Sequence, residues 1–246
     1  MKLPYGESSF EKIRTAGYYY VDKTRYVELL EAQAESYVMI LRSRRFGKTL
    51  FCSMLGCYYD RRYDDRFAGL FRGTYIYDHP TPGRNSYLVL NFDFSGISTE
   101  TLRDANEGFA EEVRQCVRLF AGRYREYVSP AEQKQILKSG KPNDILSALF
   151  RIIEEKGMGR CVYVIIDEYD HFANNILSQG KESFKDLVRT EGYIRPFYEA
   201  LKKGTKNVVD RIFITGVMPV LLDSLTSGFN ISANLSADAR YNEMFG

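Results

Sequence analysis

Four short apolar runs punctuate the chain, and none of them alternates with polar residues. They are rich in valine, isoleucine and aromatic residues and occupy residues 37–41, 87–92, 161–166 and 211–215. Uninterrupted runs of this kind are typical of strands that are buried on both faces of a parallel sheet. The pattern therefore predicts four buried strands.

Between these runs, apolar residues recur at helical spacing. The predicted helices cover residues 24–34, 49–59, 99–127 and 143–156. Strands that alternate with helices predict an α/β fold with an open parallel sheet, right-handed crossovers and helices on both faces. Residues 99–157 contain more helix than one crossover needs, so we expect a helical insert there. Loops are predicted at 78–86 and 139–143, which are rich in Gly, Pro and Ser.

Composition and charge narrow the classes of partner only slightly. The 246 residues are 44% hydrophobic, and the chain has 34 Lys and Arg residues and 32 Asp and Glu residues. This near balance gives no global reason to expect nucleic acid or an anionic membrane as a partner. The N-terminus has no secretory pattern, and no segment approaches the roughly 20 apolar residues of a membrane span. We expect one large cytoplasmic domain spanning 1–246, with reduced cysteines and no zinc site.

The stretch LRSRRFGKTL, residues 41–50, carries the first candidate chemistry. It follows a predicted strand and opens a predicted helix, the context of a phosphate-binding Walker A loop, although Arg42 replaces the usual first glycine. Gly47 would let the backbone approach phosphates, Lys48 would contact the β- and γ-phosphates, and the Thr49 hydroxyl would ligate Mg²⁺. The alternative is a solvated lysine in the first turn of a helix.

The second candidate segment, IIDEYD, ends a strand in consecutive carboxylates, the pattern of a Walker B segment. Asp167 would hold Mg²⁺ through water, and Glu168 would polarise the attacking water. An acidic pair can equally cap the following helix, and Asp170 is equally compatible with a supporting role or an N-cap. Since ligands bind at the carboxyl ends of strands in open α/β sheets, we expect both segments to meet there.

Other polar residues end neighbouring strands. Thr215 follows the fourth run and is a candidate sensor of the γ-phosphate, or a strand-end hydroxyl bonded to the backbone. Asn91, a second candidate sensor, and Asp93 end the second run and could share the same rim.

Upstream of the loop, GYYYVDKT offers aromatic side chains for an adenine base. Tyr20 and Asp22 are assigned to the nucleotide site, and Asp22 or Thr24 is expected to cap the helix that follows. Packing of the tyrosines at the sheet edge is the alternative for the aromatic ones.

Together, RSRRFGKT, GYYYVDKT, IIDEYD and the closing TSGFNISANLSADARYNEMFG resemble the bacterial AAA-ATPase-like family. The resemblance covers nearly the whole chain. It implies a P-loop NTPase of the additional-catalytic-glutamate type, with an extra strand between the loop strand and the Asp167 strand. Ser43 departs from the family loop, where proline is usual. Relatives usually continue into a PD-(D/E)XK nuclease-like domain, which we expect to be absent from this chain.

Three arginines in the loop add permanent charge beside the expected phosphates. Arg44 or Arg45 is a candidate arginine finger in cis, and pairing with carboxylates or exposure to solvent is the alternative. The catalytic assignments are Glu168, Lys48, Arg44 and Arg45. The nucleotide-binding assignments are Arg42, Ser43, Arg44, Arg45, Phe46, Gly47, Lys48, Thr49, Leu50, Tyr20 and Asp22.

These assignments predict Mg²⁺-dependent ATP binding and hydrolysis that drives or regulates an attached or partner effector domain. A nucleotide-dependent switch with negligible turnover is the alternative, and phosphoryl transfer to a small molecule would need an acceptor pocket that we do not identify. DNA or RNA stays open as a partner through the nuclease-like domain of relatives. The basic segments 114–125 and 202–206 could contact phosphate backbones, but such charge runs are usually solvated helix faces. Arg195 and Arg240 are candidates for contribution to a neighbouring subunit's site.

Overall fold

The computed structural model describes residues 2–98, 100–171, 173–174, 193–219 and 230–245. Residue 99 of the expected insert, and 226–229 and 246 of the resembling tail, lie outside the described residues. The strands are β1 Tyr37–Leu41, β2 Leu88–Asp93, β3 Val162–Asp167, β4 Val209–Gly216 and β5 Ala233–Asn234. The helices in the first part of the chain are α1 Phe10–Thr15, α2 Arg25–Glu31, α3 Lys48–Tyr59, η1 Arg61–Arg66, α4 Phe67–Phe71 and α5 Tyr75–Asp78. Those that follow are α6 Leu102–Arg123, α7 Pro130–Ile136, α8 Pro142–Glu155, α11 Ile194–Gly204 and η2 Ala239–Tyr241.

The strands form one five-stranded parallel sheet in the order β2-β3-β4-β1-β5. The expected α/β class and open parallel sheet are thus confirmed. β4 lies between the loop strand β1 and the Asp167 strand β3, where the resemblance implied an extra strand. Because all strands are parallel, their carboxyl ends meet at one edge of the sheet.

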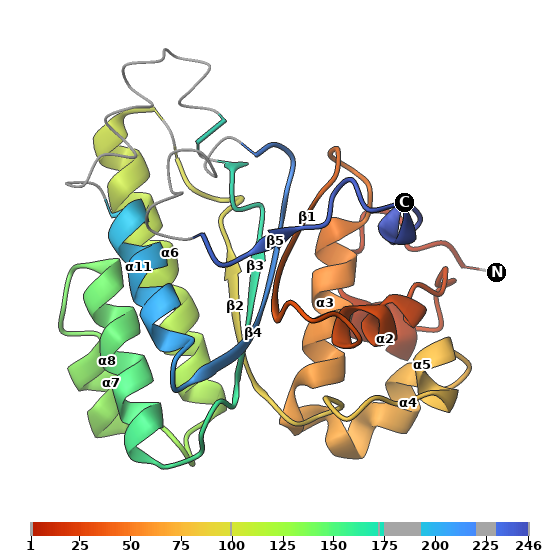
Figure 1. Cartoon of the computed structure of the whole chain (residues 1–246), viewed down its shortest axis with the longest axis horizontal. Helices are drawn as coiled ribbons and strands as arrows, with labels where there is room; N and C mark the ends of the chain where they lie inside the picture. Colours follow the sequence, from red (N-terminus) through yellow and green to blue (C-terminus); the bar gives the residue numbers. More distant parts are fainter. Residues whose placement is uncertain (1, 99, 172, 175–192, 220–229, 246) are drawn as a thin grey trace.

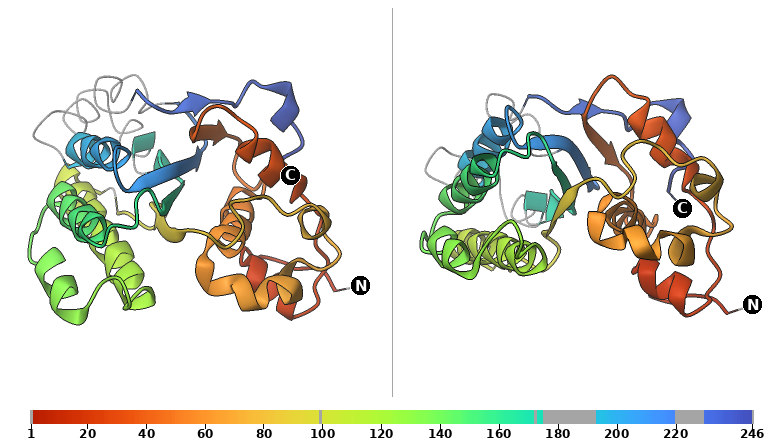
Figure 2. Two further views of the ribbon diagram at one scale, coloured as in Figure 1. Left: turned by 60° about the horizontal axis from the view of Figure 1, so that its bottom comes forward. Right: turned by 90° about the horizontal axis from the view of Figure 1, so that it is seen from below.

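Successive residues of each strand enter two different cores. In β3, Val164 and Ile166 pack with α6, α8 and α11, whereas Tyr163 and Ile165 pack with α3 and α4 on the opposite face. Figures 1 and 2 show the two groups of helices on either side of the sheet. This double coverage explains why the strands read as continuous apolar runs rather than as alternating ones.

The region between β2 and β3 is helical, as its spacing indicated. α6, α7 and α8 occupy one face of the sheet together with α11. A capping box starts α7: the Ser129 hydroxyl accepts from the Glu132 N–H, and the Glu132 carboxylate accepts from the Ser129 N–H. The apolar residues of α8, including Ile145, Leu149 and Ile153, are fully buried.

The predicted elements differ from the observed ones mainly where elements are short. The expected runs match β1 to β4 with small boundary shifts, and β4 extends over Val209–Gly216. The sequence interpretation missed β5, whose two residues are too few to show a period, and the short helices α1, α4 and α5. It also assigned no helix to Ile194–Gly204, an amphipathic segment that packs against α8.

Gly216, at the carboxyl end of β4, allows a close approach between three strand ends. A Cβ at this position would lie 2.5 Å from Cδ1 of Tyr169 and would also clash with the Asp170 carboxylate. We expect Gly216→Ala to lower the free energy of unfolding by about 1–3 kcal/mol, because the added methyl overpacks against the buried side chains of Tyr169 and Asp170. Urea denaturation measures the effect.

Gly122, in the last turns of α6, provides the matched control, since a Cβ there meets nothing within 4 Å. Gly122→Ala should stabilise the protein by up to about 1 kcal/mol through helix propensity. Equal effects of the two substitutions would show that the contact at Gly216 is not tight.

Candidate functional site

The loop between β1 and α3 has a left-handed backbone at two residues. Gly47, the N-cap of α3, has φ 79°, and Arg45 has φ 66°. Arg42, where the phosphate-loop pattern has glycine, is not among the residues with positive φ. Besides Gly47, the loop position whose backbone favours glycine is therefore Arg45 and not Arg42. The bulky Arg45 adopts a strained conformation that costs of order 1 kcal/mol.

Lys48 opens α3 and is nearly buried, with 3% of its side chain exposed. Its ammonium lies 3.2 Å from Oε1 of Glu168 and donates to the Ser43 carbonyl at 3.3 Å. This placement excludes the alternative of a solvated lysine. The loop segment and the acidic segment meet in space as expected.

Asp167 ends β3 with only 4% of its surface exposed. Burial raises the pKa of its carboxyl to about 6, the Thr49 side chain opposes the shift, and the negative charge of Asp93 adds to it. Asp93 is the register partner of Asp167 on β2, so the prediction that it shares this rim is confirmed. Burial and a neighbouring negative charge both disfavour the ionised form of Asp167. A cation bound beside it would stabilise that ionised carboxylate.

We expect Asp167→Asn to stabilise the free protein at pH 7.5. A folded-state pKa of about 6 against about 4 in the unfolded chain means that ionisation opposes folding, with a cost that grows between about pH 4 and 6 and is complete above that range. The amide avoids the cost, so the gain should reach about 2–3 kcal/mol at pH 7.5 and disappear near pH 4. Thermal unfolding of both proteins across this range, without Mg²⁺ or nucleotide, measures it.

Asp238→Asn is a suitable control. Its pKa is lowered by Arg240, so its ionised form stabilises the fold and the amide should not be stabilising. If Asp167→Asn destabilised the protein at pH 7.5, ionisation of Asp167 would not oppose folding.

Of the residues that follow Asp167, Glu168 lies beside the loop and Asp170 stabilises the fold. Glu168 has a left-handed backbone, φ 50°, and its side chain stays partly exposed beside Lys48. Asp170 is fully buried and accepts from the N–H groups of Val217 and Met218 and from the Asn174 amide. Asp170 therefore fastens the residues after β4 to the end of β3, and its backbone carbonyl also accepts from the Asn174 N–H at the start of the helical turn that follows.

A polar cavity of about 640 Å³ lies over the start of α3. Its lining combines the loop and Glu168 with an N-terminal segment that the sequence interpretation did not assign to the site. The lining residues are Tyr5, Gly6, Glu7, Ser8, Arg45, Gly47, Lys48, Thr49, Leu50 and Glu168.

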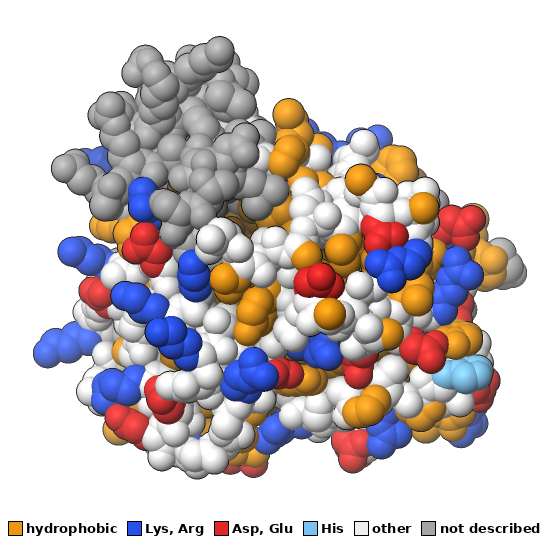
Figure 3. Space-filling view, in the orientation of Figure 1, with side chains coloured by type: hydrophobic (Ala, Val, Ile, Leu, Met, Phe, Trp, Pro, Cys, Tyr) orange, Lys and Arg blue, Asp and Glu red, His pale blue; other side chains and the backbone are white. Residues whose placement is uncertain are grey.

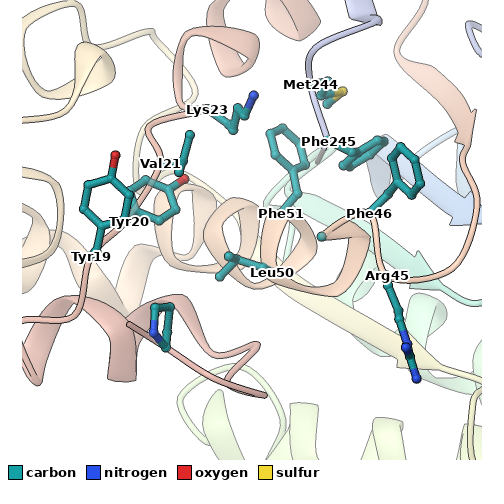
Figure 4. Close-up of a pocket in the computed structure, with 12 residues that line it drawn as sticks. Tyr19, Tyr20, Val21, Lys23, Arg45, Phe46, Leu50, Phe51, Met244 and Phe245 are labelled. Atoms are coloured by element: carbon teal, nitrogen blue, oxygen red, sulfur yellow. The ribbon is translucent and has the colours of Figure 1, made fainter. Parts of the chain in front are cut away.

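An apolar cavity of about 330 Å³ adjoins the same loop and shares Arg45, Gly47 and Leu50 with the polar cavity. Figure 4 shows Tyr19 and Tyr20 on one side and Phe46, Phe51 and Phe245 on the other. Tyr20 and Phe46 both line this cavity, and their assignment to a nucleotide site stays a prediction. Met244 and Phe245 were missed as lining residues: the tail was part of the resemblance, but its apolar pair carried no local signal of a ligand.

Arg42 and Asp22 lie elsewhere than their site assignments suggested. The Arg42 guanidinium donates to the carbonyls of Leu41, Ser236 and Tyr241, at 2.9, 2.8 and 3.2 Å, and is not available to phosphates in this arrangement. Asp22 accepts from the N–H and hydroxyl of Thr24 and from the N–H of Tyr75, so it organises the start of α2 and α5. Asp22 thus bonds to the first N–H of α5, and its assignment to the nucleotide site stays a prediction.

The two candidate sensors do not line the polar cavity. Asn91 faces the middle of α3 near Gly56, eight residues beyond Lys48, because β2 sits beside the helix body rather than its start. Thr215 is fully buried, and its hydroxyl has no hydrogen-bond partner among the described residues. Neither side chain contacts the loop cavity in this conformation.

The remaining candidate arginines fall into two groups. Arg44 and Arg45 are exposed, and neither forms an ion pair within the described part of the chain. Arg195 pairs with Glu199 at 3.1 Å and Arg240 with Asp238 at 2.6 Å. Over the face shown in Figure 3, basic and acidic side chains are interspersed, so this face offers no large basic patch for nucleic acid.

The fold and the loop together define the class. An open parallel sheet whose strand β1 enters α3 through Gly47, Lys48 and Thr49 is consistent with the P-loop nucleoside triphosphatases. The sequence matches the family described as "Predicted AAA-ATPase" over residues 4–226, and the chain belongs to this family.

An uncharacterized protein in the vnfD 5′ region of Azotobacter chroococcum mcd 1 is 31% identical over 257 residues. The alignment covers all of this chain and 43% of that protein, so the chain spans less than half the length of this relative. No solved structure matches the chain. No helix within the described residues combines the length and apolar character needed to cross a membrane.

Proposed function

We propose that this protein binds ATP at the junction of β1 and α3 and hydrolyses it in a magnesium-dependent reaction. The observation that carries the proposal is the pair of cavities that share Gly47, one lined by Lys48, Thr49 and Glu168 and the other by aromatic side chains. A nucleotide has the same two-part chemistry, with charged phosphates at one end and a flat apolar base at the other.

The phosphates are proposed to lie at the start of α3. The first turn of α3 presents free N–H groups there, and the twelve-residue helix adds the positive end of its dipole. Lys48 exchanges its ion pair with Glu168 for phosphate oxygens. The exposed Arg44 and Arg45 add positive charge beside the proposed phosphate site.

Thr49, Asp167 and Asp93 form an oxygen donor set that fits Mg²⁺, since a hard cation prefers carboxylate and hydroxyl oxygens. No group of three ligating His, Cys, Asp or Glu side chains occurs among the described residues. Thr49 and Asp167 would hold the ion. When bound, it would neutralise charge on the phosphates.

Glu168 is proposed to accept a proton from the attacking water. It leaves its ion pair with Lys48 when phosphates engage the lysine, and its carboxylate then faces the polar cavity. The position of β4 between β1 and β3 supports the additional-catalytic-glutamate type of P-loop NTPase. The strained backbone at Glu168 supports a functional role, because such strain clusters at reacting sites.

The base is proposed to occupy the apolar cavity between Tyr20 and the phenylalanines. We further propose that hydrolysis drives or regulates an attached or partner effector domain. In the relatives that the sequence resembles, this domain is nuclease-like. The relative's greater length supports a further domain in that protein.

Phosphate release by the purified chain with MgATP tests the proposal, together with calorimetric titration of ATP. Micromolar to millimolar binding with steady release supports an ATPase. Absence of ATP binding overturns the proposal.

A nucleotide-dependent switch with negligible turnover is the second candidate. The ion pair between Lys48 and Glu168 favours it, because that contact occupies the group that would activate water. ATP binding without phosphate release, with and without DNA, would support the switch over the ATPase.

A further inference from the structure

The described residues 233–245, which we call the C-terminal strap, cross the loop strand and reach the nucleotide cavity. β5 pairs with Val38 and Met39 of β1, and the Leu235 N–H donates to the Met39 carbonyl at 2.9 Å. At the end of β1, the Leu41 N–H donates to the Ser236 hydroxyl at 2.8 Å. The strap is therefore attached to the strand that carries the phosphate loop.

Arg42 fastens the strap at its middle. This residue is the first after β1, its N–H donates to the Gly216 carbonyl at 3.0 Å, and its guanidinium holds the carbonyls of Ser236 and Tyr241. One planar fork thus bridges two points of the strap that are five residues apart, which a lysine ammonium cannot do with the same geometry. The loop and the strap share this arginine.

The end of the strap is packed against α3 and the aromatic cavity. Met244 is fully buried, Phe245 is 4% exposed, and the Phe245 ring meets Phe51 edge to face at 5.4 Å. Tyr241 is fully buried and accepts from the Gln33 amide at 2.8 Å, and the Glu243 carbonyl accepts from Lys23 at 2.7 Å. Figure 4 shows Met244 and Phe245 near Phe46, which precedes Gly47, and Phe51, which lies in α3.

We propose that the strap is a nucleotide-responsive element: Met244 and Phe245 close the base cavity, and Arg42 is a positioning residue that couples them to the phosphate loop. This inference rests on the proposed function, since the occupant of the cavity is the base of the nucleotide. A base that stacks in the cavity gains contact with the strap only while Arg42 holds it down. Phosphates alone touch the loop and leave the strap unchanged.

Two ligands distinguish the contribution of the base to binding from that of the phosphates. They are MgATP and magnesium tripolyphosphate, which lacks a base. Calorimetric titration of both is compared for the unchanged protein and for Phe245→Ala, Arg42→Ala and Arg42→Lys. We expect each variant to bind ATP about ten- to hundredfold more weakly, the range of a lost aromatic stack, with tripolyphosphate affinity unchanged within about twofold. Arg103→Ala is the control, because this exposed arginine pairs with Glu107 on the same helix, α6, and lines neither cavity, so it should change neither affinity.

Hydrogen exchange adds a readout that a purely structural role would not move. Amides 235–245 should exchange more slowly with MgATP bound than with tripolyphosphate bound, and Arg42→Ala should remove this difference. Equal losses for both ligands in Arg42→Ala would make Arg42 a phosphate ligand and overturn the inference. Full ATP affinity in Arg42→Lys, which keeps the charge and folds conservatively, would overturn it as well. Failure of the unchanged protein to bind either ligand would instead refute the proposed function.

Discussion

Lys48→Ala is expected to lower the affinity for MgATP by about a hundredfold or more and to abolish phosphate release. The ammonium is the one buried cation at the start of α3 in the described structure, and charge-assisted contacts to phosphate are each worth about 1.5–3 kcal/mol. Calorimetric titration and a phosphate-release assay measure the two effects.

Lys206→Ala is the control for this change, because Lys206 is exposed beyond the end of α11 and lines neither cavity that adjoins the loop. It should leave both quantities unchanged. Intact ATP binding and turnover in Lys48→Ala would refute the assignment of this loop as the phosphate site.

Glu168→Gln is expected to slow phosphate release by about 100- to 10,000-fold while ATP stays bound. The amide cannot accept the proton from water. It also leaves the nearly buried Lys48 without its anionic partner, which should destabilise the free protein and strengthen binding of the polyanion. Single-turnover assays, ATP titration and thermal unfolding with and without MgATP follow these three effects.

The control for Glu168→Gln is Glu155→Gln, which removes an exposed carboxylate that pairs with Arg151 on α8. Surface pairs of this kind contribute little, so activity should be unchanged. Loss of ATP binding in Glu168→Gln would show that the residue organises the site and does not activate water.

The fold could be predicted from the sequence to the extent that its elements are long or buried on both faces. The runs that became β1 to β4 were visible because both faces of each strand are covered. β5 was invisible because two residues carry no period, and it forms only where the strap meets β1. The amphipathic helix α11 was missed although its buried face, with Phe197 and Leu201, has helical spacing.

The candidate site was predictable where its chemistry is local to one segment. Lys48 and Glu168 follow from two short motifs at strand ends, and parallel topology brings such ends together. The contact of Asp22 with the Tyr75 N–H could not be predicted, because it is set by the packing of α2 against α5. Asn91 was misplaced because the sequence does not tell which part of α3 a neighbouring strand passes.

By itself, the sequence determined the class of fold and the two segments that carry the proposed chemistry, because apolar periodicity and short polar motifs act through neighbouring residues. The tertiary structure alone decided what surrounds them. Arg42, the departure from the usual loop glycine, turns toward the carbonyls of the strap, and the strained left-handed position falls on Arg45. The placement of Arg42 depends on hydrogen bonds to Ser236 and Tyr241, about two hundred residues away in the chain, and no local pattern can specify such bonds.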